Sequence, residues 1–299
     1  MNNRHKKERI LVMKKGILLA ITLLSLVGRS TAQNLKINVS DARFTAPLLE
    51  KLIKEYKKVD PDFQAQVLTH DGVKSDARVS LDNEASATIL GRYIVLPIAN
   101  SQNVLLENKK VRKGLNGKLT KQIFVLKDYL EALDAEENGE KELPGTVYSL
   151  TGSKAITTKA FANALHVSPN KIKGKKIVGR EENALTAVQN HNDAVSFNVA
   201  SLVYDTQSKK PVSGLTVLPI DIDDNGKITE EERSAFGTIT QLTEYIDHLS
   251  DISVPIGNIY FDTQNPKAAV FANWVSQNGQ QLLHEYGYLR ANTKLIAQK

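Results

Sequence analysis

The stretch INVSDARFTAPLLEKLIKEYKK, residues 37–58, indicates the fold class of this chain. Ile37–Val39 has the composition of a short strand, and Ser40–Phe44 is a polar turn. Pro47 can occupy the first turn of a helix, because a backbone N–H has no helical partner there. The apolar residues that follow repeat at i, i+3 and i+4 and predict one buried helix face: Leu48, Leu49, Leu52, Ile53 and Tyr56. This strand–turn–helix unit is typical of α/β proteins, and the free N–H groups at its helix start can also bind an anion.

A second unit of the same kind lies near the middle of the chain. Thr146–Leu150 is a candidate strand, Thr151–Ser153 is a turn rich in hydroxyls and glycine, and Ala155–Leu165 has helical spacing. Two such units that face one cleft would direct N–H groups and hydroxyls at a single anion. The alternative is structural, because serine and threonine hydroxyls also cap helices.

Residues 1–32 have the organisation of a secretory signal peptide. A basic segment precedes the apolar run GILLAITLLSLV, which is too short to span a bilayer comfortably, and Ser30–Ala32 forms a cleavage signal. The sequence contains no cysteine, which excludes lipid attachment at a new N-terminal cysteine. We therefore expect a periplasmic protein that begins at Gln33.

The signal peptide also explains the basic composition of the chain. The sequence has 39 Lys and Arg against 33 Asp and Glu, and the leader holds seven of the basic residues and one of the acidic ones. The mature chain therefore has 32 residues of each sign. This balance gives no support for nucleic-acid binding, so no nucleic-acid partner is expected.

The most specific motif is DIDDNGKITEEE, which runs from Asp221 to Glu232 and has the spacing of a calcium-binding loop. Gly226 allows the sharp turn, and Glu232 closes such a site with two oxygens. The alternative is an acidic Asn-Gly turn. A strand precedes the loop and the motif occurs once, so we expect one structural calcium ion. The expected ligands are Asp221, Asp223, Asn225, Lys227 through its carbonyl, Thr229 and Glu232.

Other segments give plainer expectations. Tyr93–Leu96 predicts a buried strand, and Pro97 favours its departure from the sheet. Helical spacing predicts one helix over residues 121–133 and a long one over 268–286, with Val270 on its buried side and Gly287 after its end.

The sequence contains no motif that indicates catalysis. G-x-S-x-G, H-E-x-x-H and P-loop patterns do not occur, and no histidine pair has metal-ligand spacing. His70 and Asp71 are neighbours, but a loop turn is the simpler interpretation than a catalytic dyad. We therefore expect a binding protein and no enzyme.

Several segments in order resemble the periplasmic substrate-binding proteins of ABC transporters, in particular the phosphate-binding-like branch. They are ARFTAPLLEKLIKEYKK, GRYIVLPIANSQN, YSLTGS followed by TTKAFANAL, AVSFNVASLVYD and FANWVSQNGQQLLHEYGYLR. This resemblance covers most of the mature chain. It implies a type II, two-lobed α/β fold in which each lobe is a mixed sheet flanked by helices.

The resemblance also implies how the chain is divided and what it contacts. Residues 33–102 and 199–299 would form the first lobe, with the calcium-type loop 221–232, and residues 103–198 the second. The ligand would lie in the cleft between them. The expected partners are a small oxyanion and an ABC permease in the inner membrane, and the protein is expected to be a monomer.

By the same resemblance, two turns would hold the ligand. The first is formed by Ala42, Arg43, Phe44 and Thr45, and the second by Ser149, Thr151, Gly152, Ser153 and Thr157. Arg43 stands where the family usually has a hydroxyl, and the second turn lacks the family's Arg and Asp. Asp71 and Asp76 are candidates for the missing aspartate. Arg43 could supply the missing cation, because a guanidinium pairs well with oxyanions.

Two functions follow from these features. The first is capture of a small oxyanion, in first place phosphate, for ABC import. The second is a calcium-stabilised envelope or interaction protein of the same fold that no longer binds phosphate. The complete two-lobe pattern favours the first function, and the changed turns favour the second.

Overall fold

The structure is a computed structural model that describes residues 34–81, 86–139, 141–152 and 155–291. The predicted signal peptide, residues 1–32, lies outside these ranges. The strands are β1 (Leu35–Asn38), β2 (Ala65–Leu68), β3 (Ala77–Ser80), β4 (Thr88–Asn100), β5 (Thr146–Thr151), β6 (Lys175–Val178), β7 (Ala194–Val199), β8 (Leu215–Val217), β9 (Ile256–Thr263) and β10 (Tyr288–Leu289).

Helices connect most of these strands. The α-helices are α2 (Ala46–Tyr56), α3 (Lys109–Lys113), α4 (Gly117–Phe124), α5 (Tyr129–Glu137), α6 (Ile156–Ala164), α7 (Glu181–Asn190), α8 (Ala200–Val203), α9 (Glu230–Ala235), α10 (Ile239–His248) and α11 (Pro266–Gln277). The 3-10 turns are η1 (Arg43–Thr45), η2 (Val104–Glu107), η3 (Pro169–Lys171), η4 (Gly279–Leu282) and η5 (His284–Tyr286).

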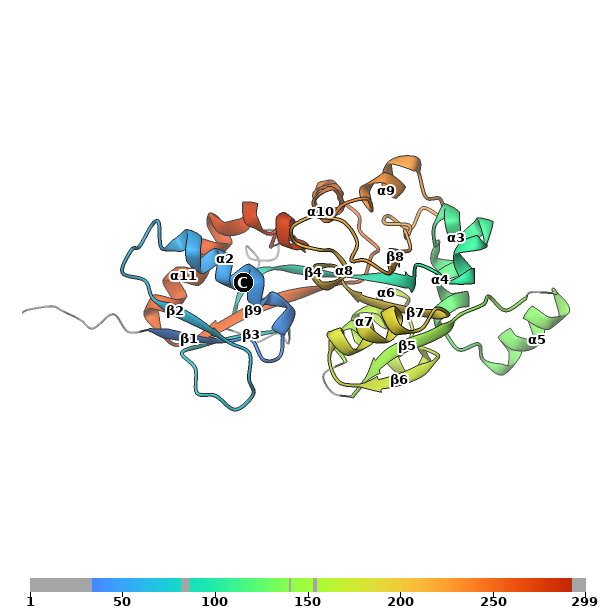
Figure 1. Cartoon of the computed structure of the whole chain (residues 1–299), viewed down its shortest axis with the longest axis horizontal. Coiled ribbons are helices and arrows are strands. Elements are labelled where there is room, and N and C mark those ends of the chain that lie inside the picture. The colour runs from blue at the N-terminus through green and yellow to red at the C-terminus, as the bar shows by residue number, and fades with distance from the viewer. Residues whose placement is uncertain (1–33, 82–85, 140, 153–154, 292–299) are drawn as a thin grey trace, which may run out of the picture.

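The strands form a mixed sheet in the order β2-β1-β3-β9-β4-β7-β5-β6, and β8 and β10 also pair with β4. The long strand β4 runs through both halves of the molecule (Figure 1). Its first half pairs with β9 in the lobe that holds β1, β2 and β3. Its second half pairs with β7, next to β5 and β6. A single strand therefore joins two lobes, with helices packed on each.

Strand β4 corrects the expectation for Pro97. The strand continues to Asn100, and Pro97 pairs with Phe197 of β7. The carbonyl of Pro97 accepts a hydrogen bond from the Leu218 amide, while the ladder between β4 and β8 covers only Ile98–Asn100. The missing N–H of Pro97 therefore falls just beyond the end of β8, where it breaks no ladder bond.

The opening unit has the predicted form. Strand β1 is followed by a turn and by α2, which has Pro47 in its first turn. The five apolar residues expected on its inner face are all buried. Tyr56 at the end of this face packs in an aromatic cluster with Phe63, Phe271 and Trp274. The second lobe has a cluster of its own, in which the rings of Phe161 and Phe197 stack 4.2 Å apart.

The helix expected over residues 121–133 is two helices. α4 ends at Phe124, and α5 begins at Tyr129 after an extended link. Asp128 caps α5 in a capping box with Glu131, with both bonds at 2.9 Å. An aspartate N-cap starts a new helix, because its carboxylate satisfies amides that a continuous helix would bond internally.

The long helix expected over residues 268–286 ends early. α11 stops at Gln277, and the 3-10 turns η4 and η5 lead to Gly287, which has a φ of 81°. The side chain of Gln280 donates to the Leu90 and Val275 carbonyls, both at 2.9 Å, and thereby replaces helical bonding. Val270, expected to be buried, is 58% exposed.

The lobe boundaries taken from the sequence stay a prediction, but the contacts of the calcium-type loop are informative. The Leu115 amide donates to the Pro219 carbonyl at 2.7 Å, and the Asp221 amide donates to Leu115 at 3.1 Å. Arg233 donates to the Lys113 carbonyl. The loop is thus bonded to residues 113–115, which the sequence division placed in the second lobe. Among the described residues, no helix has the length and hydropathy needed to cross a membrane.

Candidate functional site

The first predicted turn is held tightly by its own hydrogen bonds. The Ser40 amide donates to Asn38 Oδ1 at 2.7 Å, and the Ala42 amide donates to the Val39 carbonyl at 2.9 Å. Thr45 is buried, and its hydroxyl donates to the Ala42 carbonyl at 2.7 Å. Phe44 belongs to the core, since its ring lies 5.8 Å from that of Tyr93. The turn thus has the predicted shape, but the hydroxyl proton of Thr45 bonds within the turn.

Arg43 begins η1 and is half-buried. Its Nε is buried and has no hydrogen-bond partner among the described residues. Asp41, one possible surface partner, forms an ion pair with Arg78, whose Nε lies 3.1 Å from Asp41 Oδ2. A buried donor without an acceptor costs free energy, so Arg43 is an unusual residue of this turn, although it does not line the hollow described below.

The second predicted turn is divided between core and surface. Ser149 is fully buried, and its hydroxyl accepts a bond of 3.0 Å from Lys176 Nζ. Thr157 is buried in the first turn of α6. Thr151 and Gly152 are exposed at the end of β5, and Gly152 has a φ of 106°, which favours glycine. Ser153 lies outside the described residues.

A third strand–turn–helix unit, which the sequence analysis did not single out, places an arginine beside the first predicted turn. β6 is followed by Gly179 and Arg180 and then by α7. Arg180 Nη1 donates to the Ser40 carbonyl at 2.9 Å, and its Nη2 lies 3.5 Å from Asp71 Oδ2. The guanidinium therefore connects the second lobe with two loops of the first. The signal was present in KIVGREE, which repeats the pattern of the other two units.

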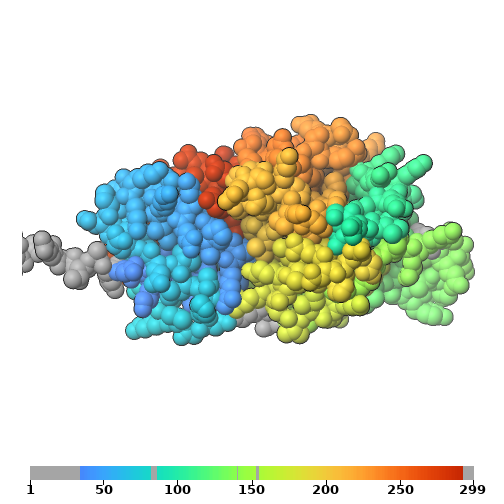
Figure 2. Space-filling model, in the orientation of Figure 1, coloured from blue at the N-terminus to red at the C-terminus, as the bar shows by residue number. Residues whose placement is uncertain are grey.

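A polar hollow of about 260 Å³ lies on the first-lobe side of this contact. It is lined by Asn38, Ser40, Asp41, Asp71, Gly72, Val73, Ser75 and Arg78. We call this hollow, together with Arg180, the cleft site. On the face shown in Figure 2, the blue and cyan residues of the first lobe meet the yellow residues of the second. Of the two aspartates considered from sequence, Asp71 lies at the cleft site, whereas Asp76 accepts a bond from the Lys36 amide.

Glu181 follows Arg180 and has an unusual environment. The residue is buried, and its Oε1 has no hydrogen-bond partner among the described residues. Burial raises the pKa of the Glu181 carboxyl to about 7. The backbone carbonyl of Glu181 accepts a bond of 2.7 Å from Asn198, at the end of β7. A partly protonated carboxyl therefore lies directly beside the arginine that reaches across the cleft.

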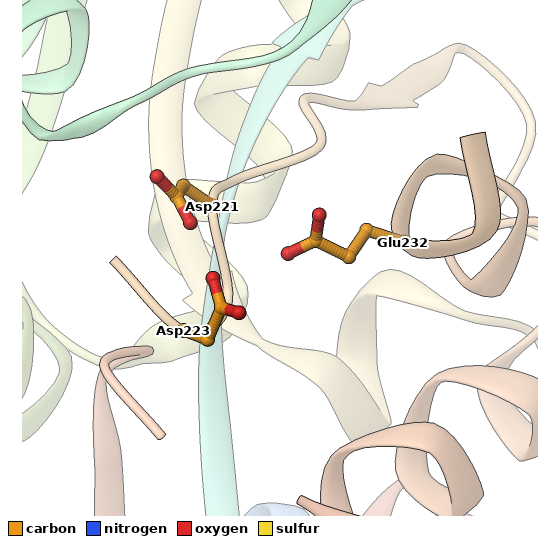
Figure 3. A group of neighbouring side chains, drawn as sticks. All are labelled: Asp221, Asp223 and Glu232. Carbon is orange, nitrogen blue, oxygen red and sulfur yellow. The ribbon is translucent and has the colours of Figure 1, made fainter. Parts of the chain in front are cut away.

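The calcium-type loop brings its carboxylates together, as Figure 3 shows. Oxygens of Asp221, Asp223 and Glu232 lie within 4.8 Å of one another. Two ligands of one calcium ion, each at 2.3–2.6 Å from it, are at most about 5 Å apart. Asp221 and Glu232 are buried. Burial raises the pKa of Asp221, and the nearby carboxylates Asp223 and Glu232 add to this shift.

The rest of the loop supports these three carboxylates. The Gly226 amide, at a φ of 82°, donates to Asp221 Oδ2 at 2.7 Å. The side-chain oxygen of Asn225 accepts a bond from the Lys227 amide at 2.9 Å. Thr229 and Glu232 form a capping box at the start of α9. All six predicted ligands therefore lie on one compact loop, and the donor set is the oxygen-rich one that calcium prefers.

Solved structures resemble this chain in shape at low sequence identity. A proposed phosphate ABC transporter substrate-binding protein with bound phosphate, from Clostridium perfringens, aligns with a TM-score of 0.55 and 12% identity over 87% of this chain and 100% of that one. The BenM effector-binding domain with its effector benzoate aligns with a TM-score of 0.50 and 14% identity over 87% and 96% of the two chains. An ABC-type phosphate transport receptor from Vibrio cholerae gives 0.48 and 13% over 87% and 100%.

No protein-family model matches the chain, and no curated protein matches it in sequence. Identities this low establish the fold and leave the ligand open, since one fold carries many functions. The phosphate and the benzoate in the first two structures illustrate that range. The shared architecture and the strand order described above lead to one conclusion: the chain has the two-lobed α/β fold of type II periplasmic binding proteins.

Proposed function

We propose that this chain is a secreted, periplasmic solute-binding protein that captures a small oxyanion, in first place phosphate, and delivers it to an ABC permease. The observation that supports this proposal best is Arg180, which reaches from the second lobe to Ser40 and Asp71 of the first. Arginine provides several N–H donors in a planar fork that matches an oxyanion. The protein would act by binding and release, without catalysis.

The cleft site has the groups that such a ligand needs. The start of α7 follows Arg180 directly, and helix starts favour negative charge, although Glu181 and Glu182 already lie in its first turn. Arg180 makes only a long contact with Asp71, so an oxyanion could replace this aspartate with little loss. Asp71 could then accept a hydrogen bond from the hydroxyl of a hydrogen-bearing oxyanion such as hydrogen phosphate.

A structural calcium ion is the second part of the proposal. Asp221, Asp223 and Glu232 would hold the ion, with Asn225, Thr229 and the Lys227 carbonyl completing its shell. The ion would offset the repulsion between these carboxylates and hold the loop against residues 113–115. It would thus stabilise this contact and take no part in ligand capture.

One observation favours the alternative, a calcium-stabilised envelope or interaction protein that no longer binds phosphate. Two hydroxyls of the predicted turns make bonds within the protein: Thr45 donates to Ala42, and Ser149 accepts from Lys176. In addition, Asp41 and Asp71 line the hollow and would repel an anion. The two functions therefore differ in whether the arginines outweigh these carboxylates.

Isothermal titration of residues 33–299 with phosphate, sulfate, molybdate and tungstate tests the proposal. We expect phosphate binding in the wild type and a loss of about ten- to a hundredfold in affinity in Arg180→Ala, since a bond to a charged group contributes about 1.5–3 kcal/mol. Arg112→Ala, an exposed arginine on α3, is the matched control and should bind as the wild type does. No heat with any of the four anions would favour the alternative, and equal affinity in Arg180→Ala would exclude the cleft site.

A further inference from the structure

Helix α5 projects from the second lobe on an arm, residues 126–139, and is nearly uncovered. Figure 1 shows it standing away from the body of the molecule. Within α5, only Ala135 is buried. The exposed fractions are 77% for Tyr129, 70% for Leu130 and 40% for Leu133. A helix of nine residues is marginal by itself in water, and three large apolar side chains on it favour a partner that covers them.

The arm also carries a strong negative charge. Between residues 126 and 139 it has five carboxylates and a single lysine. The carboxylates are Asp128, Glu131, Asp134, Glu136 and Glu137. A surface that covers the arm should therefore be basic at its rim and apolar at its floor.

A groove of about 1050 Å³ beside the arm has this character. Its cationic side chains are Lys110, Lys113, Lys118, Lys141, Lys227 and Arg233, and Glu142 is its acidic one. Its apolar side chains are Leu119, Leu143, Pro144 and Ile228. A nine-residue helix is about 13 Å long and about 10 Å across, so it occupies about 1,000 Å³, close to the volume of the groove.

The positions of arm and groove favour exchange between two copies. Asn138 and Gly139 at the end of the arm line the edge of the groove, so α5 leads away from its own groove. In a two-fold pair of chains, each arm could lie in the partner's groove, and the same contact would form twice. We propose that this protein forms a two-fold dimer in which each acidic α5 arm occupies the basic groove of the second copy.

This dimer would replace the monomer expected from the sequence. It does not depend on anion capture, because neither the arm nor the groove contains a residue of the cleft site. The calcium-type loop contributes Gly226, Lys227 and Ile228 to the groove. Calcium binding to that loop would therefore also affect the shape of the surface that receives the partner's arm.

Charge reversal on each side gives a decisive test by sedimentation equilibrium of residues 33–299. Asp134→Lys with Glu136→Lys and Glu137→Lys makes the arm basic, and Lys110→Glu with Lys113→Glu and Lys141→Glu makes the groove acidic. We expect a dimer for the wild type, at about 10–100 μM protein, and monomers for each triple variant, because arm and groove then repel each other. An equimolar mixture of the two triple variants should form a heterodimer, since both contacts regain opposite charges.

Two controls test whether the loss of the dimer is specific to the arm and the groove. Lys54→Glu with Lys58→Glu and Lys267→Glu changes three exposed lysines on the first lobe by the same charge and should leave the dimer intact. Circular dichroism should show equal folding in all variants, since the changed side chains are exposed. A wild-type monomer throughout the concentration range would overturn the proposal, and so would a mixture that stays monomeric. If each arm instead lay in the groove of its own chain, the wild type would be a monomer, which is the first of these outcomes.

Discussion

At the scale of single residues, the proposed site has two candidate arginines with different surroundings. Arg180 bonds across the lobes, whereas Arg43 has a buried Nε that lacks an acceptor. The sequence drew attention to Arg43 because it stands in the turn before Pro47. It did not indicate Arg180, because its partners Ser40 and Asp71 are more than a hundred positions away. Contacts of that range are visible only in the folded chain.

The first prediction at this scale concerns Arg43. If its side chain serves the anion, Arg43→Ala should weaken anion binding by about ten- to a hundredfold, because a charge-assisted bond is lost. The stability of the protein should change little or rise slightly, since a half-buried turn residue contributes little packing and its buried Nε has no acceptor among the described residues. Titration of both proteins with the same anion measures the first effect and urea unfolding the second. Equal affinities would show that Arg43 does not bind the anion, and Arg180 would remain the proposed anion-binding arginine.

The second prediction concerns Glu181 and pH. The pKa of this carboxyl is 4.5 in its ordinary state and about 7 in the folded protein because of burial. Between pH 4.5 and 7 the unfolded chain releases a proton that the folded chain retains, so the free energy of unfolding should fall as pH rises. The stabilisation is complete below pH 4.5, and its loss by pH 8 should total about 3 kcal/mol.

Replacement by glutamine tests this linkage. Glu181→Gln should unfold at higher urea than the wild type at pH 8 and at nearly the same urea at pH 4.5, because a neutral amide has no ionisation cost. Glu182→Gln, the exposed neighbour on α7, is the control and should follow the wild type at each pH. Parallel pH profiles for the wild type and Glu181→Gln would show that Glu181 is ionised in the folded state without penalty.

At the scale of elements, local signals decided where most helices begin, and distant contacts decided where some of them end. The Asp128 capping box separates α4 from α5. After α11, the side chain of Gln280 bonds to β4, and the chain does not continue as an α-helix. The loop Asp221–Glu232 is the element whose form was most fully encoded locally. Its backbone amides already point at its own carboxylates.

The prediction at this scale concerns calcium. Millimolar calcium should raise the melting temperature of residues 33–299 relative to chelator, with a gain of about 2.7 kcal/mol at a hundredfold excess over Kd. Glu232→Gln should remove most of this gain, because the ligand with two oxygens is lost, while glutamine still serves in the capping box with Thr229. Glu231→Gln on the same helix is the control, since Glu231 is exposed and is no expected ligand. Equal melting temperatures with calcium and with chelator would rule out the site.

At the scale of the whole molecule, β4 connects the two lobes, because each half of the strand pairs within a different lobe. It is one strand of a continuous sheet, yet its two halves serve different lobes. The turn that precedes α2 belongs to the first lobe and the turns that precede α6 and α7 to the second, and the contact of Arg180 with Ser40 brings two of them together. The acidic arm and the basic groove share no residue with the cleft site, so dimer formation and ligand capture would use separate surfaces.

The sequence by itself determined the local parts of this protein. The periodicity of residues 48–56 predicted the buried face of α2, and ligand spacing predicted the loop that gathers Asp221, Asp223 and Glu232. These features depend on neighbours within one helix or one loop, so local pattern was sufficient. The resemblance, in turn, predicted the two-lobed fold.

Only the tertiary structure decided which side chains meet. It placed Ser149 in the core, brought Arg180 to Asp71, carried Pro97 through the sheet and joined the calcium-type loop to residues 113–115. Each of these outcomes depends on strand pairing or helix packing between segments far apart in the chain. A turn residue can face the cleft or the core with the same local sequence, and burial against distant elements decides between the two.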